Sequence, residues 1–193
     1  IEASLRRLAH YDYWKDRLVP SILMESPADI MVYGMGEKPM PQIADALNDG
    51  MPIEALLDIP QTMVRRPLDE IPTDGSDVVL HSFEECLRDK KKQAENFRNI
   101  DIESNLWHGH TLWQATGNVA IKVNRTNPPM TTEEIDATFD LPYTRLPHPR
   151  YNGKRIPAYE MIRHSVNMHR GCFGGCAFCT ISAPQGKFIA SRS

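Results

Sequence analysis

The sequence predicts an α/β protein, and three stretches indicate this fold class. Residues 28–33 are expected to form a buried strand of a parallel sheet, because residues 30–33 are contiguous and apolar. Residues 34–37 form a glycine-containing turn, apolar side chains recur at helical spacing over residues 40–47, and Gly50 ends that helix. Residues 117–123 alternate apolar side chains, which is typical of another strand. A strand, a glycine turn and a helix in this order are characteristic of an open α/β sheet.

Further elements are expected on both sides of this unit. Residues 2–9 have the apolar spacing of a short helix. Prolines and turns dominate residues 51–77, which predicts a connector with one short edge strand at residues 61–65. Residues 78–81 then read as another strand.

Two capping boxes predict where helices begin in the middle of the chain. Ser82 with Glu85 opens one helix, and Thr131 with Glu134 opens a shorter one. Cys86 lies on the apolar stripe expected to run along the first helix as far as residue 97. We therefore expect Cys86 to be a packed core residue.

The C-terminal part leads into a cysteine-rich stretch. Prolines and basic residues punctuate residues 141–157, which favours an exposed arm over an anion-binding surface. Residues 161–170 are expected to form a strand that runs directly into the cysteines.

Three of the four cysteines, Cys172, Cys176 and Cys179, have the spacing C-x3-C-x2-C. An odd number of thiols this close together cannot all form disulfides, so they are expected to converge on a metal centre. Gly174 and Gly175 fill most of the longer gap, and glycine can adopt the positive φ needed to wrap a bulky ion or cluster. Three sulfur ligands without an obvious fourth favour an iron–sulfur cluster, which can leave one iron open.

A zinc site is the alternative for the same cysteines. A structural zinc ion requires four protein ligands, and His169, three residues before Cys172, could complete H-x2-C-x3-C-x2-C. The three-residue gap between the first two cysteines is less usual for zinc, so the spacing favours the cluster. With zinc, the chain would be a structural or regulatory α/β module without catalysis.

The cysteine motif, with Phe178 directly before its last cysteine, resembles the cluster motif of the radical S-adenosylmethionine superfamily. Residues 170–193 are similar to the YgiQ-like (UPF0313-type) branch, as are residues 1–14 and 140–149. The resemblance implies that the three cysteines hold a [4Fe-4S] cluster whose fourth iron binds S-adenosylmethionine. An electron from that cluster would cleave the cofactor to a 5′-deoxyadenosyl radical. The backbone of Phe178 would help to hold the adenine.

The resemblance also implies a division into domains. Residues 1–60 would be the C-terminal part of a Rossmann-like N-terminal domain, the tail of its open sheet. Residues 61–160 would be an α/β extension with a proline-rich connector, and residues 161–193 would begin a radical SAM partial (β/α) barrel with the cluster loop after its first strand. Related families sometimes bind cobalamin through residues that would precede Ile1. We expect no cobalamin in this protein. The remaining cofactor contacts come from later strands, so the isolated chain is expected to show little turnover.

Composition limits the classes of partner. The chain has 193 residues, 41% of them hydrophobic, and a net charge of −3. It therefore lacks the overall positive charge that would predict nucleic-acid binding. No apolar run approaches the roughly 18 residues of a membrane span. Cysteines spaced for metal binding suit a reducing compartment, which predicts a cytoplasmic protein. The resemblance implies an external electron donor and a substrate that the sequence does not identify. The first residue is Ile1 rather than methionine, which leads us to expect a segment of a longer protein.

Two aromatic patches are candidate ligand surfaces. Trp107, His108, His110 and Trp113 could line a substrate or metal site, although ordinary loop and core roles are favoured. If this patch folded over the cluster, it would be the best candidate for substrate contact. The aromatic residues within 10–14 are expected to cap an edge of the core. No catalytic residue is assigned.

Overall fold

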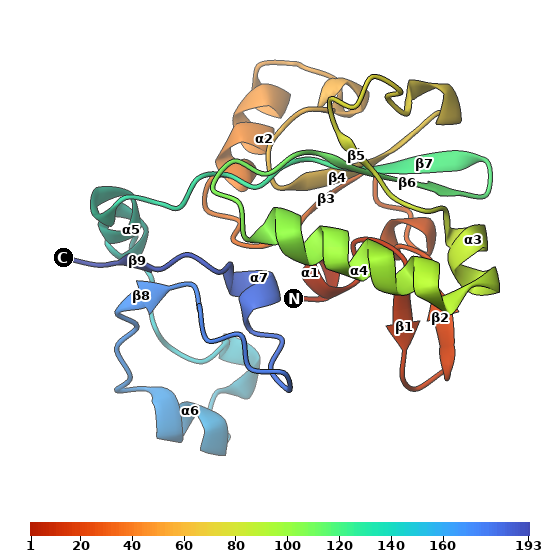
Figure 1. Cartoon of the computed structure of the whole chain (residues 1–193). Coiled ribbons are helices and arrows are strands. Elements are labelled where there is room, and N and C mark those ends of the chain that lie inside the picture. Colours follow the sequence, from red (N-terminus) through yellow and green to blue (C-terminus); the bar gives the residue numbers. More distant parts are fainter.

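The computed structural model describes residues 1–193 and is built around a mixed five-stranded sheet (Figure 1). The strands in spatial order are β3 (Ile30–Val32), β4 (Thr62–Arg66), β7 (Val119–Val123), β6 (Leu112–Thr116) and β5 (Val78–Val79). Neighbouring strands are antiparallel except for β5 and β6, which are parallel. The α/β class predicted from the sequence is therefore confirmed.

Seven α-helices, four short 3-10 helices and two small two-stranded sheets complete the fold. The α-helices are α1 (Glu2–Leu5), α2 (Pro39–Asn48), α3 (Phe83–Arg88), α4 (Lys90–Ser104), α5 (Thr132–Phe139), α6 (Pro157–Ile162) and α7 (Ser182–Gln185). The 3-10 helices are Ile22–Met24, Ile53–Ala55, Leu68–Glu70 and Pro149–Tyr151. The small sheets pair β1 (His10–Asp12) with β2 (Arg17–Val19), and β8 (His169–Arg170) with β9 (Ala190–Ser191). No helix has the length and apolar character needed to cross a membrane.

Two strands have sheet positions that differ from the prediction. β3 was expected to be a buried parallel strand, but it is half-buried at the sheet edge and antiparallel to β4. β4 was expected at an edge, but it lies between β3 and β7, and its residues Thr62, Met63 and Val64 are all buried. The Rossmann-like arrangement expected for residues 1–60 is thus not confirmed, and the three-part domain division stays a prediction.

The main hydrophobic core unites the sheet with the N-terminal segment. Met63 and Ile121, from the neighbouring strands β4 and β7, are completely buried. They belong to one cluster with Leu8, Leu23, Tyr33, Leu80, Leu112 and Val123. The aromatic residues of the β1–β2 hairpin do not join this core, contrary to expectation: the Tyr13 and Trp14 side chains are exposed and pack edge to face on each other at 5.6 Å.

The helix predicted after Ser82 is broken in two at Asp89. The capping boxes at Ser82/Glu85 and at Thr131/Glu134 are both confirmed. Asp89 has an extended backbone, and its carboxylate accepts a hydrogen bond from the Lys91 amide, so it ends α3 and caps α4. The predicted apolar stripe does not continue along α4, where Phe97 is exposed and a polar residue is buried instead.

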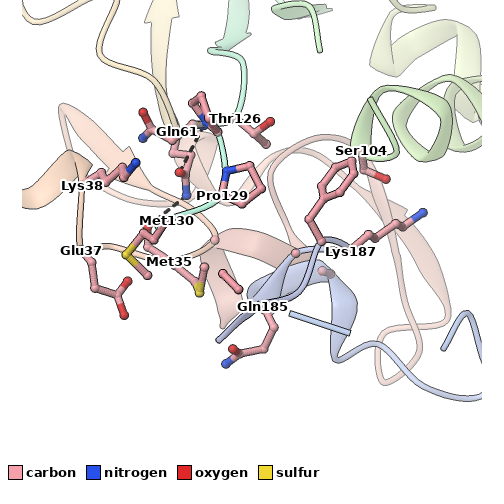
Figure 2. A pocket seen from close by; sticks show the side chains of 17 residues that line it. Met35, Glu37, Lys38, Gln61, Ser104, Thr126, Pro129, Met130, Gln185 and Lys187 are labelled. Carbon is pink, nitrogen blue, oxygen red and sulfur yellow. Dashed lines mark hydrogen bonds between the residues drawn. The ribbon is translucent and has the colours of Figure 1, made fainter. Parts of the chain in front are cut away.

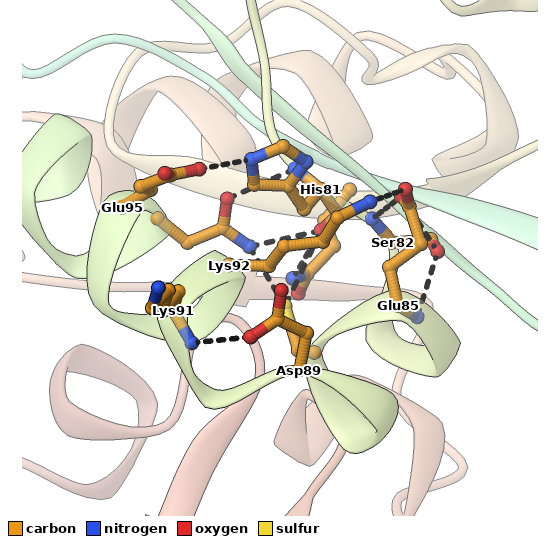
Figure 3. A network of polar contacts seen from close by, with 10 residues as sticks. His81, Ser82, Glu85, Asp89, Lys91, Lys92 and Glu95 are labelled. Atoms are coloured by element: carbon orange, nitrogen blue, oxygen red, sulfur yellow. Dashed lines mark hydrogen bonds and ion pairs between the residues drawn. The ribbon is translucent and has the colours of Figure 1, made fainter.

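That buried polar residue is Asn96, which hydrogen-bonds to His81, a labelled member of the polar network in Figure 3. Its amide accepts from the His81 backbone N–H at 2.9 Å and donates to the His81 carbonyl oxygen at 2.9 Å. It also donates to the sulfur of Cys86 at 3.1 Å. Cys86 is 3% exposed, which confirms it as a core residue, and burial raises the pKa of its thiol. The network joins α4 to the end of β5.

The strand predicted over residues 161–170 is largely absent. α6 occupies the first part of this range, because Pro157 at its N-terminus has the fixed φ that starts a helix. Only His169 and Arg170 form a strand, which pairs with β9 and not with the main sheet. A first barrel strand is therefore not confirmed. The arm predicted over residues 141–157 is almost entirely exposed, as expected.

Gln114 provides a test of the polar contacts that stabilise this fold. Its side chain is buried, accepts from the Ala9 N–H at 2.8 Å and donates to the His81 carbonyl at 3.0 Å. Replacing Gln114 with Leu would leave the buried backbone N–H of Ala9 without a hydrogen-bond acceptor. We therefore expect the free energy of unfolding to fall by about 2–3 kcal/mol. Urea denaturation measures it, and Gln42→Leu on an exposed position of α2 is the matched control. Equal stability of both variants would contradict this role.

Glu85 provides a test by pH. Hydrogen bonds from Lys92 and from the Ser82 cap lower the pKa of the Glu85 carboxyl from 4.5 to about 2. The unfolded chain therefore binds the proton at higher pH than the folded chain, so the stabilisation is complete above pH 4.5 and is lost as pH falls towards 2. Glu85→Gln can still cap the helix but cannot titrate. We expect urea denaturation at pH 7 and pH 3 to show a smaller acid-induced loss of stability in the variant than in the parent chain.

Candidate metal centre

The three clustered cysteines lie on one loop, residues 171–189, between the two strands of the β8–β9 ribbon. The loop contains α7 near its end and is held by backbone hydrogen bonds at both sides. The Cys172 N–H donates to the Gly186 carbonyl at 3.0 Å, and the Arg192 N–H donates to the Met168 carbonyl at 2.9 Å. Within the loop, the Cys179 N–H donates to the Cys176 carbonyl at 3.0 Å, which closes a tight turn between those two cysteines.

Gly171 allows the loop to close on itself. Its φ is +91°, and a Cβ atom built there would lie 1.9 Å from the Phe188 carbonyl oxygen. No other residue fits this close approach without moving the backbone. The glycine before the first cysteine therefore brings the two ends of the loop together.

The donor set of the loop is chemically suited to an iron–sulfur cluster. All three cysteines are free thiols; Cys176 and Cys179 are exposed and Cys172 is half-buried. A Cβ on Gly174 would lie 3.5 Å from the Cys172 sulfur and 3.6 Å from the Cys176 sulfur, so both sulfurs flank this glycine. The absence of a side chain at Gly174 leaves the space between them open.

The side chains are not arranged as a finished metal site. No group of three or more histidine, cysteine, aspartate or glutamate side chains in the chain is gathered closely enough to hold an ion. Cys172, Cys176 and Cys179 therefore stay predicted ligands. His169, the fourth ligand of the zinc alternative, is an exposed residue of β8 opposite Ser191. Phe178 is 91% exposed, and its predicted contact with the adenine stays a prediction.

The Trp107–Trp113 patch is divided by the fold. Trp113 is buried in β6, and its indole N–H donates to the Asp77 carboxylate at 2.8 Å. His108 is exposed, and His110 lies 3.1 Å from the Glu103 carboxylate. Trp107 alone contacts the loop, because its ring packs edge to face on Phe188 at 5.1 Å. The favoured interpretation of ordinary loop and core residues therefore fits most of the patch.

A cavity of about 90 Å³ lies beside the loop (Figure 2). Its wall combines the turn after β3, Gln61, residues 126–130 and residues 183–190. Its three charged groups are each neutralised by an ion pair: Glu37 with Arg170, Lys38 with Glu134, and Lys187 with Asp101. The rest of the wall consists of apolar side chains, neutral amides and the hydroxyl-bearing residues Ser104 and Thr126, so the cavity suits an uncharged group.

Two amides in this wall were not identified from the sequence. The Gln61 side chain donates to the Met35 carbonyl at 3.0 Å and accepts from the Asn127 N–H at 3.2 Å, which fixes the turn after β3. The Asn127 side-chain nitrogen is buried and has no hydrogen-bond partner. Residues 34–37 and the Asn127–Pro129 break were recognised only as turns. Nothing in their spacing indicates that they meet the segment after the cysteines.

Comparison with known proteins gives a consistent result. Residues 1–165 match the family model described as Radical SAM N-terminal. A UPF0313 protein of Porphyromonas gingivalis is 60% identical over 194 residues, covering 100% of this chain and 31% of that protein. A UPF0313 protein of Methanocella arvoryzae is 46% identical over 195 residues, with 100% and 32% covered. The UPF0313 protein YgiQ of Escherichia coli K12 is 38% identical over 246 residues, with 100% and 33% covered.

The chain therefore spans about a third of the length of these curated relatives. No solved structure matches it. The family model covers most of the chain, and the relatives cover all of it, including the three cysteines. The resemblance inferred from the cysteine motif and the two flanking segments is confirmed, and the chain belongs to the radical SAM family as the N-terminal region of a YgiQ-like UPF0313 protein.

Proposed function

We propose that Cys172, Cys176 and Cys179 bind a [4Fe-4S] cluster and that the whole protein uses it for the reductive cleavage of S-adenosylmethionine. One observation carries this proposal: three free thiols lie on a single loop whose two ends are fixed by backbone hydrogen bonds, in a chain of the radical SAM family. Sulfur from cysteine is the usual ligand of such clusters, and three ligands leave one iron for the cofactor.

The residues of this chain would contribute binding and orientation. When bound, the cluster would supply the electron that cleaves the cofactor. The backbone of Phe178 would hold the adenine beside the cluster, while the exposed Phe173 and Phe178 rings would exclude water once covered. Exposure of Cys176 and Cys179 leaves the loop accessible to iron and sulfide.

Several finer features belong to the same proposal. Residues 161–193 would begin a partial barrel whose later strands lie in the rest of the protein, and residues 1–60 would be the C-terminal part of a Rossmann-like N-terminal domain. Turnover would require an external electron donor and a substrate of a class that no residue here identifies. The reducing conditions that such a cluster needs favour the cytoplasm.

Cysteine substitutions test the ligand set. Changing any one of Cys172, Cys176 and Cys179 to Ala removes a sulfur ligand, so anaerobic reconstitution should give clearly less than four irons per chain. Cys86→Ser is the matched control, since this cysteine is buried in the core and away from the loop. Iron and acid-labile sulfide are assayed together. Full iron content in a Cys176→Ala variant would contradict the proposal.

His169 distinguishes the cluster from zinc. If the loop holds a cluster through three sulfurs, His169→Ala should retain iron and sulfide at the parent level. If instead the loop holds zinc through four ligands, the variant should lose affinity for zinc, and neither the variant nor the parent should bind iron. Elemental analysis of both proteins, reconstituted once with iron and sulfide and once with zinc, decides between them.

A further inference from the structure

The β8–β9 ribbon forms the base of the cysteine loop and joins it to the rest of the molecule. Arg170 pairs with Ala190 across the ribbon, so the two ends of the loop 171–189 lie side by side. Ala190 is buried with Met130 and Ile135 in a second small core that also contacts Phe139. The ribbon has no partner in the main sheet. Its position therefore depends on side-chain contacts with α5 and with the turn after β3.

Arg170 makes the contact with the turn after β3. Its guanidinium donates to the Glu37 carboxylate at 3.0 Å across 133 positions of sequence. The two side chains are 26% and 19% exposed, so this pair is much less open to water than an ordinary surface ion pair. A shielded charge-assisted hydrogen bond of this kind is stronger than a fully hydrated one.

Phe139, at the end of α5, contacts the ribbon at two arginines. The Arg192 guanidinium lies 4.6 Å from the Phe139 ring centre, and that of Arg170 lies 5.8 Å from it, both within the range of cation–π attraction. Asp136 of the same helix accepts from the Ser193 N–H at 3.2 Å. One aromatic ring thus holds an arginine from each end of the cysteine loop.

These contacts involve no cysteine side chain, so they can order the loop before any ligand arrives. Residues that position ligating segments contribute strongly to metal affinity, because a loop that is already ordered loses less conformational freedom when its sulfurs bind. Arg170 stands two residues before Cys172, with only Gly171 between them. Displacing Arg170 would displace the first sulfur directly.

We infer that Arg170, through Glu37 and Phe139, is a positioning residue that fixes the base of the cysteine loop for its metal centre. This inference rests on the proposed cluster. It assigns the pair a role in retaining the cluster rather than in the chemistry of the cofactor. Nothing in the cysteine motif itself indicates that Glu37 or Phe139 contacts Arg170.

The test uses the complete polypeptide that contains these residues, with Arg170→Gln, Glu37→Gln and the double variant. Arg155→Gln is the matched control, because it removes the same charge from an exposed ion pair with Glu160. After anaerobic reconstitution with iron and sulfide, we expect each single variant to release iron to a chelator about tenfold faster than the parent. The double variant should release iron no faster than Arg170→Gln, since Glu37 acts on the loop through Arg170. The control should match the parent.

A second measurement separates positioning from general instability. Thermal unfolding should be little changed, whereas hydrogen exchange in the cluster-free protein should be faster at the Cys172 and Arg192 amides, which hold the loop base. The reduced-cluster EPR signal should broaden in the variants as the loop samples more conformations.

The outcomes are distinguishable. If the parent binds a cluster and the variants release iron at the rate of Arg155→Gln, the inference is wrong and the proposed function stands. If the parent binds no cluster, the proposed function fails. The exchange data then decide the inference: unchanged exchange at the Cys172 amide overturns it, and faster exchange supports it as a device that orders the loop.

Discussion

The antiparallel pairing of β7 with both β4 and β6 is the interaction on which the rest of the structure depends. β7 shares a ladder with residues 62–66 on one side and with residues 112–116 on the other. Every other strand of the main sheet attaches to this central triplet. Its buried residues Met63, Ile121 and Val123 pack in one hydrophobic core with Leu8 and Leu23 of the N-terminal segment. The turn after β3 is held by Gln61, directly before β4, so the triplet also places Glu37.

From that sheet, a chain of contacts leads to the cysteines. The turn after β3 presents Glu37 to Arg170, and α5 presents Phe139 and Asp136 to the end of the loop. The loop thus projects from a fixed base, while two of its three sulfurs stay exposed. In the proposed function, iron, sulfide and further protein would surround the loop and complete its structure. The ordered base would then limit the entropy lost as the sulfurs bind the proposed cluster.

Polar side chains determine much of the geometry that the hydrophobic pattern does not. The pattern correctly placed α2, β7 and the starts of α3 and α5, because capping boxes and strict periodicity are local signals. It did not indicate the break at Asp89, where a local cap competes with a continuing helix. It could not identify Asn96 or Gln114 as buried, since amides enter a core only where distant backbone groups meet them.

The sequence alone determined the family, the α/β class and the identity of the three candidate ligands, because the cysteine spacing and the capping signals are local. Tertiary structure decided the strand order, since pairing partners such as β3 and β4 lie far apart in the chain and both orientations satisfy an apolar pattern. It also decided that residues 157–162 are helical and that only two residues before Gly171 form a strand. The contact between Glu37 and Arg170 spans most of the chain, and only the folded molecule brings this carboxylate to the arginine beside the first cysteine.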